Sequence, residues 1–166
     1  YIDRARADLN SYYTEAGFVN EKTSIKAIVF GGKEETYQSW YGTPEAVVNN
    51  DLEGIQAFID RNYPSDAEAE NLLNSGRTYN FYTYDNEIDS YQQTHYQLHA
   101  SHQFNAMFSA NISGNFTRGK GYYEQYRVGD NTKIYGFDSV VNNGTTFKET
   151  SAIHRLWLDN DLYGFN

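Results

Sequence analysis

The most regular pattern in the chain is an alternation of apolar and polar residues between Phe108 and Thr117. One set of alternate positions holds Phe, Ala, Ile, Gly and Phe, and the other set holds only Ser, Asn and Thr. Because successive side chains of a β-strand point to opposite faces, this pattern predicts a strand with one apolar face and one uncharged polar face. Such a polar face is typical of the lumen wall of a barrel, whereas a solvated sheet face usually carries more charge.

Weaker alternation predicts four further strands. Tyr96, Leu98 and Ala100 alternate with polar residues, and the short link 103–107 joins this segment to the first one as an antiparallel hairpin. The five predicted strands span residues 4–19, 24–41, 84–103, 108–126 and 149–166. They are much longer than the roughly six residues of a typical soluble strand, and about 9 to 11 tilted residues suffice to cross a bilayer.

The connections between these strands alternate in length. Short turns are expected near Asn20 and Asn105, and long loops at 43–83 and 127–148. Outer-membrane barrels have short periplasmic turns on one side and long extracellular loops on the other. The sequence therefore predicts an all-β fold, in which the chain is a segment of an antiparallel transmembrane β-barrel.

The first long loop is predicted to be partly helical. Thr43 followed by Pro44 indicates a helix start with Thr43 as the N-cap. The apolar residues that follow recur at helical spacing: Val48, Leu52, Ile55 and Ile59. The pair Ser65 and Glu68 has the spacing of a capping box for a second short helix, which Gly76 would end.

The high content of aromatic residues indicates that part of the protein surface contacts both water and an apolar medium. Hydrophobic residues make up 39% of the chain, yet it contains 16 Tyr and 10 Phe. Many aromatic residues cluster where the predicted strands end, as in the aromatic girdles of membrane barrels. No run of about 18 apolar residues predicts a transmembrane helix, and no signal peptide is recognisable. From the missing initiator Met and the patterned last residues we expect an internal fragment of a longer barrel protein.

The net charge of −9 is concentrated in one part of the chain. The window 43–90 contains ten acidic and two basic residues, and therefore carries −8. Such a chain repels phosphate backbones, so we expect no nucleic-acid partner. The chain has no cysteine, which excludes disulfides and thiolate metal sites.

Five collinear strings resemble the middle strands of the barrel in TonB-dependent receptors of the Bacteroidetes. They are YIDRARADLNSYY (1–13), FGGKEETYQSWYGTPE (30–45), YDNEIDSYQQTHYQLH (84–99), FTRGKGYYEQY (116–126) and WLDNDLYG (157–164). The resemblance covers most of the chain outside the two loops. It implies about five long strands of a barrel of about 22 strands, in the cell outer membrane. It also implies an N-terminal plug domain, absent from these residues, and a TonB protein that acts through that plug.

The resemblance implies transport, without enzymatic activity. We expect part of a receptor for active uptake of a scarce nutrient, such as a ferric siderophore, haem or cobalamin. Outer-membrane lipid and a small extracellular ligand would then be the other partners. Two alternatives remain open at this point: a passive outer-membrane porin, and a soluble all-β carbohydrate-binding or hydrolase domain.

Aromatic and basic residues at the predicted extracellular end are the candidates for ligand binding. Their rings could stack on a flat ligand, with basic side chains nearby, although anchoring in the membrane interface explains each ring as well. The candidates are Lys33, Tyr37, Trp40, Arg77, Tyr84, Tyr122, Tyr123 and Tyr126.

The spacing of the histidines and carboxylates does not favour metal binding or catalysis. His95 and His99 would share a zinc-binding face on a helix, but on a strand they face the lumen roughly 13 Å apart, with His102 on the other face. No cofactor is therefore expected.

The acidic residues allow two further alternatives. Asp85, Glu87 and Asp89 are a candidate Ca²⁺ site in the loop, although a solvated acidic loop is favoured. The carboxylate pairs Glu34–Glu35 and Asp159–Asp161 do not give the opposed geometry of a glycosidase.

Overall fold

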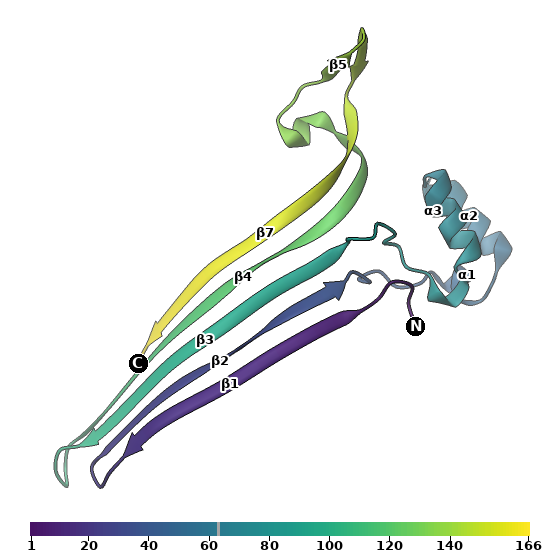
Figure 1. Ribbon diagram of the computed structural model, residues 1–166. Coiled ribbons are helices and arrows are strands. Elements are labelled where there is room, and N and C mark those ends of the chain that lie inside the picture. The colour runs from purple at the N-terminus through teal and green to yellow at the C-terminus, as the bar shows by residue number, and fades with distance from the viewer. Residues whose placement is uncertain (63) are drawn as a thin grey trace. The chain divides into compact units, whose positions relative to one another are not determined.

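The computed structural model describes residues 1–62 and 64–166. The chain is mostly β-sheet, with 55% of residues in strands and 19% in helices. This confirms the all-β class. The sheet is open, and its strand order is β1-β2-β3-β4-β7, so each long strand lies beside its neighbour along the chain (Figure 1). The long strands are β1 (Ala7–Val19), β2 (Thr23–Tyr37), β3 (Ile88–Gln103), β4 (Ser109–Asn131) and β7 (Glu149–Phe165).

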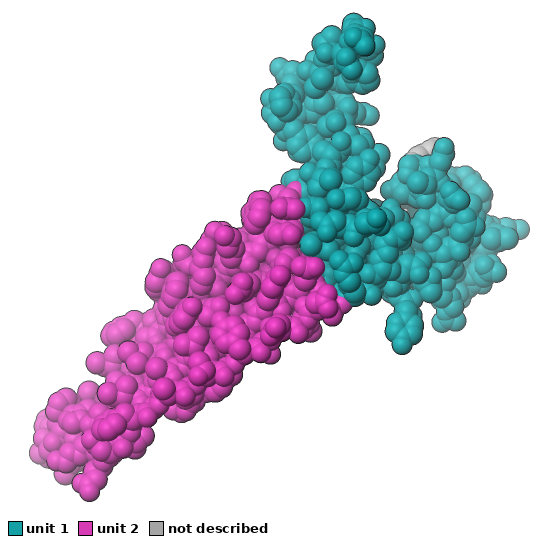
Figure 2. Space-filling view, in the orientation of Figure 1, with its two compact units in different colours: residues 1–6, 36–88, 124–154 teal, residues 7–35, 89–123, 155–166 magenta. Residues whose placement is uncertain are grey.

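The chain divides into two compact units, coloured separately in Figure 2. Unit 1 comprises residues 1–6, 36–88 and 124–154, and contains every helix of the described residues. Unit 2 comprises residues 7–35, 89–123 and 155–166, which form the greater part of the five-stranded sheet. In the described part of the chain, no helix is long and apolar enough to cross a membrane.

The register of β3 and β4 confirms that the two alternating patterns share their faces. Leu98 lies opposite Gly114 and Ala100 opposite Ile112, so the apolar positions of both strands fall on one face, here called the apolar face. His95 lies opposite Thr117 on the other, polar face. The apolar face is exposed in this chain, with Leu98 and Ile112 each 55% accessible.

Contacts between side chains extend the two faces to the other strands. Thr94 lies an even number of residues from Leu98 on β3 and therefore on the apolar face. The Tyr12 hydroxyl lies 2.8 Å from Thr94 Oγ1, so Tyr12 of β1 is on the apolar face too. On the same face, the ring centroids of Phe116 and Tyr163 stack 4.8 Å apart across β4 and β7. Phe30 of β2 stacks on a histidine of the polar face. Unit 2 is therefore a two-faced sheet throughout.

Both short turns of unit 2 are built by an asparagine side chain. Asn20 Oδ1 accepts hydrogen bonds from the backbone N–H groups of Lys22 (2.9 Å) and Thr23 (2.8 Å). Asn105 Oδ1 does the same for Met107 at 2.9 Å and for the residue after it. An asparagine side chain that imitates a backbone turn in this way fixes a tight connection. The two turns lie at the same end of the sheet (Figure 1).

Glycines on β4 allow close approach of β3. At Gly121 a Cβ atom would lie 2.3 Å from the backbone oxygen of Ser90, so a side chain there needs a backbone shift. At Gly119 a Cβ atom would meet the hydroxyl of Tyr91, whose ring crosses β4 at this point. The glycines at 119 and 121 thus make room for a neighbouring strand and its tyrosine.

The strand ends differ from the prediction by three residues or more in four places, the first being β1, which begins at Ala7 instead of residue 4. β2 ends at Tyr37 instead of residue 41, because Trp40 and the tyrosine after it join an aromatic cluster outside the sheet. β3 begins at Ile88 instead of residue 84, because 84–87 forms a turn in which the Glu87 N–H donates to the Tyr84 oxygen at 3.3 Å. β4 continues to Asn131 instead of ending at 126.

The expected loop 127–148 also has regular structure. It contains a 3-10 helix, η2 (Thr132–Tyr135), and a small hairpin of β5 (Val140–Asn142) and β6 (Thr145–Phe147). Asn143 and Gly144 form the hairpin turn with φ of 49° and 79°. An Asn-Gly pair with both residues at positive φ is the preferred two-residue hairpin turn, so this dipeptide was an available signal.

The helical part of unit 1 has three helices, α1 (Glu45–Val48), α2 (Leu52–Asn62) and α3 (Asp66–Asn74), followed by a short 3-10 helix, η1 (Gly76–Thr78). The capping box of Ser65 and Glu68 at α3 is confirmed. The prediction at Thr43 is wrong: Pro44 occupies the N-cap position and no side chain caps α1. Asn50, with φ of 55°, separates α1 from α2.

The small core of unit 1 lies between these helices. Val47, Ile55, Leu72 and Tyr79 are buried, with Ala46, Phe58 and Ile59 packed against them. Val48 and Leu52, which share the predicted helical spacing with Ile55, are 36% and 61% exposed. The break at Asn50 rotates the two helices out of one common register, so Val47 is buried in place of Val48.

Candidate ligand-binding groove

Unit 1 contains an open groove with a volume of about 730 Å³, which is in the range of small-molecule sites. The segment after β2, the start of α3, the stretch 81–87 and the end of β4 all contribute to its walls. Its aromatic lining consists of Tyr41, Phe81, Tyr82, Tyr84 and Tyr126. Its charged and amide lining consists of Glu68, Glu87, Gln125, Arg127 and Asp130.

The aromatic rings form two groups. Phe81 meets Tyr41 at 4.9 Å and Tyr82 at 5.3 Å between ring centroids, in both cases edge to face. Tyr84 and Tyr126 lie 5.9 Å apart and are tilted by 45°. In an edge-to-face pair the edge of one ring covers one face of the other, and the remaining ring faces stay uncovered by that contact. Tyr41, Phe81 and Tyr126 remain 60%, 45% and 46% exposed, so a large area of aromatic surface is open to a ligand.

A fully buried glutamine holds the base of the groove. Gln38 is 0% exposed, and its Nε2 donates to the backbone oxygens of Ile88 at 3.1 Å and Glu124 at 2.8 Å. Its Oε1 accepts from Gln125 Nε2 at 2.8 Å. Its backbone oxygen accepts from Asn80 Nδ2 at 3.0 Å. One side chain thus links the end of β2 to the beginning of β3 and to β4.

A buried carboxylate stands beside this glutamine. Glu87 is 5% exposed, and its two oxygens accept the backbone N–H groups of Tyr84 (3.1 Å) and Tyr126 (3.3 Å). Burial raises the pKa of the Glu87 carboxyl, and the backbone hydrogen bonds oppose that rise only in part. Burial also raises the pKa of Tyr37 to about 12, and its hydroxyl donates to the Tyr84 oxygen at 2.7 Å.

The other charged side chains that line the groove form ion pairs or hydrogen bonds with neighbouring residues. Arg127 Nε lies 3.0 Å from Asp130 Oδ2, and the Tyr135 hydroxyl donates to the same carboxylate at 2.8 Å. Glu68 accepts the backbone N–H and the hydroxyl of Ser65 at 2.7 Å each, as the capping box requires. Among the described lining residues, three carboxylates therefore face one guanidinium that is already paired.

Two of the eight predicted ligand residues, Tyr84 and Tyr126, line the groove. Tyr37 is buried beneath it at 3% exposure, and Trp40 lies edge to face against Tyr82 at 6.0 Å. Arg77 is exposed in η1. The buried position of Tyr37 explains its hydrogen bond to the backbone and removes its ring face from any ligand.

The three other predicted ligand residues lie in unit 2. Lys33 is exposed and pairs with Glu35 at 3.8 Å. Tyr122 packs on Trp157 with centroids 4.9 Å apart and under the guanidinium of Arg155 at 4.2 Å. Tyr123 lies opposite Asp89 in the β3–β4 register. None of the three lines the groove of unit 1.

Sequence reasoning missed Tyr41, Phe81 and Tyr82 as groove residues, and also Gln125. The signal that could have found the first three was the density of aromatic residues on both sides of the helical segment. Gln125 and Gln38 gave no signal, because a buried amide looks like any surface glutamine in a sequence.

The candidate Ca²⁺ site is not assembled. Both oxygens of Glu87 are taken by backbone N–H groups, while Asp85 is exposed. Among residues 1–62 and 64–166, no group of three His, Asp or Glu side chains is placed to hold a metal ion.

His95 and His102 contact residues of neighbouring strands in the sheet. His95 Nδ1 lies 2.8 Å from Thr117 Oγ1, and its ring stacks on Phe30 at 4.5 Å on the polar face. His102 Nδ1 lies 2.8 Å from Thr23 Oγ1, on the apolar face. The predicted opposite facing of His95 and His102 is therefore confirmed.

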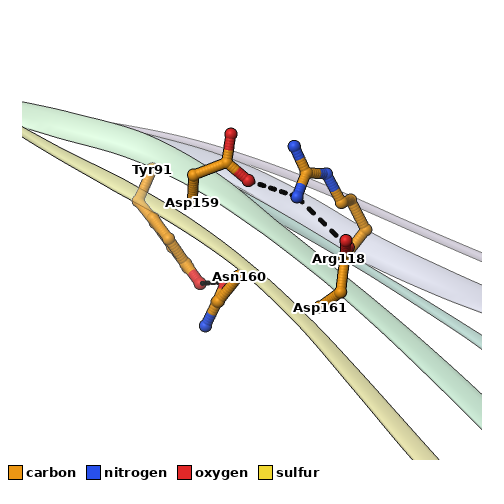
Figure 3. A network of polar contacts seen from close by, with 5 residues as sticks. All are labelled: Tyr91, Arg118, Asp159, Asn160 and Asp161. Atoms are coloured by element: carbon orange, nitrogen blue, oxygen red, sulfur yellow. Dashed lines mark hydrogen bonds and ion pairs between the residues drawn. The ribbon is translucent and has the colours of Figure 1, made fainter.

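The two aspartates of the carboxylate pair on β7 form ion pairs with an arginine of β4. Arg118 of β4 lies between Asp159 and Asp161 and contacts both (Figure 3). Asn160 points to the opposite face, where the Tyr91 hydroxyl donates to its Oδ1 at 3.2 Å. The two aspartates share one face and one arginine, which is not the arrangement of two opposed carboxylates across a sugar bond.

Comparison with known proteins found no matching family model, no matching curated protein and no matching solved structure.

We predict that Gln38→Met destabilises unit 1 by about 2 to 4 kcal/mol, because it leaves two buried backbone oxygens and one amide without their partner. Hydrogen exchange of the amides at 80–88 and 124–128 would then become faster. Gln56→Met is the matched control, since Gln56 bonds only across an exposed helix turn. Unchanged exchange in the Gln38 variant would contradict the role given to this side chain.

We predict that the free energy of unfolding depends on pH through the Glu87 carboxyl. A carboxyl whose pKa is raised in the folded state stabilises the fold below its unfolded pKa, and that contribution is lost as pH rises through the folded value. The unfolding free energy of the natural protein should therefore fall, relative to that of Glu87→Gln, as pH rises above the ordinary glutamate pKa of about 4.3. Urea midpoints measured from this pH upward check it, with Asp85→Asn as the exposed control. A natural protein that gains stability relative to Glu87→Gln as pH rises would refute the assignment.

Proposed function

We propose that this chain forms neighbouring strands in the barrel of a TonB-dependent outer-membrane receptor of the Bacteroidetes type. In this proposal, unit 2 crosses the outer membrane and unit 1 lies outside the cell. The receptor captures a small extracellular ligand and takes it up with energy supplied by TonB through a plug domain. The observation that supports it best is the exposed apolar face of unit 2.

The apolar face continues across all five long strands. Thr23 and Tyr12 face this side, so Ile25 and Phe18, which lie an even number of residues away on the same strands, do so too. Phe18, Ile25, Leu98, Ile112 and Tyr163 are between 41% and 79% exposed. A soluble protein rarely leaves so continuous an apolar surface uncovered. Lipid chains would cover it in the proposed barrel.

The height of this face suits a bilayer. The residues from Thr94 to His102 on β3 span roughly 26 Å at about 3.3 Å per residue, close to the about 25 Å apolar band of outer-membrane barrels. Arg118, with its two aspartates, lies opposite Thr94, at one end of the band. His102 and Phe104, whose rings meet at 4.6 Å, lie at the other end. Charged and aromatic groups would then meet the lipid headgroups at the two borders.

The sheet edges also favour a larger barrel. In the described residues, β1 and β7 end the sheet, and no strand pairs with their outer edges. Five strands are too few to close, since the smallest single-chain barrels have about eight. Strands of the same protein on both sides would satisfy the open backbone groups of β1 and β7.

The groove of unit 1 is the proposed point of capture. Two connections between the long strands, 38–87 and 132–148, are much longer than the two short turns, and long connections are extracellular in such barrels. The residues that form the groove come from the first of these connections and from the end of β4. The proposal therefore assigns capture of the ligand to this groove.

We predict that Leu98→Arg prevents assembly of the protein in the outer membrane, whereas Gln97→Arg does not. The two residues are neighbours on β3 but lie on opposite faces, and Leu98 is the middle residue of the band, where an arginine facing lipid costs about 2 to 4 kcal/mol. Cell fractionation and heat-modifiable mobility of the folded protein measure the difference. Equal tolerance of both variants, or natural protein in the soluble fraction, would refute the membrane proposal and favour the soluble alternative.

We further predict that uptake depends on the proton gradient and is competed by unlabelled ligand. Uptake of labelled compounds by cells with and without a protonophore separates a receptor from a porin. A porin would give uptake that is insensitive to the gradient and does not saturate.

A further inference from the structure

We infer that the groove of unit 1 binds an organic cation, such as a ligand with a substituted ammonium group. This inference rests on the proposed function for its biological setting, but the chemistry is that of the groove itself. It assigns a ligand class to the aromatic residues and carboxylates that line the groove.

The exposed rings provide the first part of the argument. Tyr41 and Phe81 lie edge to face, and both keep close to half or more of their surface accessible. Tyr126 of β4 also lines the groove. A ring face carries negative electrostatic potential, and several such faces around one space favour a cation with apolar substituents.

The charges provide the second part. Glu68, Glu87 and Asp130 line the groove together with Arg127, which gives the lining a net charge of −2 when the carboxyls are ionised. Arg127 is already paired with Asp130, at 3.0 Å. The window 43–90, which supplies most of the wall, carries −8. An anion would thus meet repulsion and, among the described lining residues, no cation without an acidic partner.

Charge complementarity excludes some of the ligands expected from the sequence. Ferric siderophores with a net negative charge and the propionates of haem would be repelled by the lining. A neutral sugar would find ring faces, but it would gain nothing from the carboxylates. An organic cation gains from both the rings and the charges, and so fits the groove best.

Choline and its neutral carbon analogue, 3,3-dimethylbutan-1-ol, form a matched pair of probes that differ in charge and hardly in shape. We expect choline to bind the purified full-length protein at least about fivefold more tightly than the alcohol. Ligand-observed NMR titration in detergent measures both, and the affinity for choline should fall as salt is added.

Two variants locate the binding to the groove. Phe81→Leu keeps an apolar side chain but removes a ring face, and should weaken choline binding by about two- to fivefold. Glu68→Gln removes a charge while a glutamine can still complete the capping box, and should weaken binding by about two- to threefold. The controls are Phe104→Leu, in a turn of unit 2, and Glu70→Gln, on the same helix as Glu68 but outside the groove lining.

The outcomes separate this inference from the proposed function. Equal binding of the two probes, tighter binding of the alcohol, or no binding of choline would overturn the cation site, whatever fractionation shows. Preferential choline binding that both groove variants weaken and both controls preserve would support it. That support would hold even if fractionation placed the protein in the soluble fraction and so refuted the receptor.

Discussion

The structure of unit 1 depends on one buried amide. Gln38 is fully enclosed, and its side chain satisfies backbone groups of two other segments and the amide of Gln125. A buried polar group without partners is costly, so this arrangement requires the segments at Gln38, Ile88 and Glu124 to keep one fixed spacing within unit 1. Glu87 beside it reinforces the same spacing through backbone N–H groups. The groove exists because these polar contacts hold its base.

The two units are stabilised in different ways. Unit 1 combines this polar network with a small apolar core around Val47, Ile55 and Leu72. Unit 2 has no comparable core within the described residues, because its strands form one sheet layer with two accessible faces. Its apolar face loses most of the hydrophobic contribution that burial would provide unless another medium covers it. The proposed membrane setting supplies that medium.

Two side-chain networks of unit 2 join neighbouring strands, one on each face of the sheet. Arg118 on the apolar face contacts two aspartates of the adjacent strand, so its charge is compensated within the sheet (Figure 3). On the polar face, Tyr91 crosses above Gly119 to reach Asn160. Arg118 thus depends on two aspartates of the neighbouring strand. Tyr91 depends on a glycine in the neighbouring strand, because a side chain at position 119 would collide with its hydroxyl.

The sequence by itself determined the strands, their two faces and the short turns, since period-two alternation and turn-forming asparagines are local properties of the chain. It also determined the capping box at Ser65. The tertiary structure decided the rest: where β2 and β3 end, the burial of Val47 in place of Val48, and the groove itself. These features arise from contacts between segments far apart in the chain, as when Gln38 meets Gln125. No local pattern distinguishes a glutamine that will be buried from one that stays on the surface.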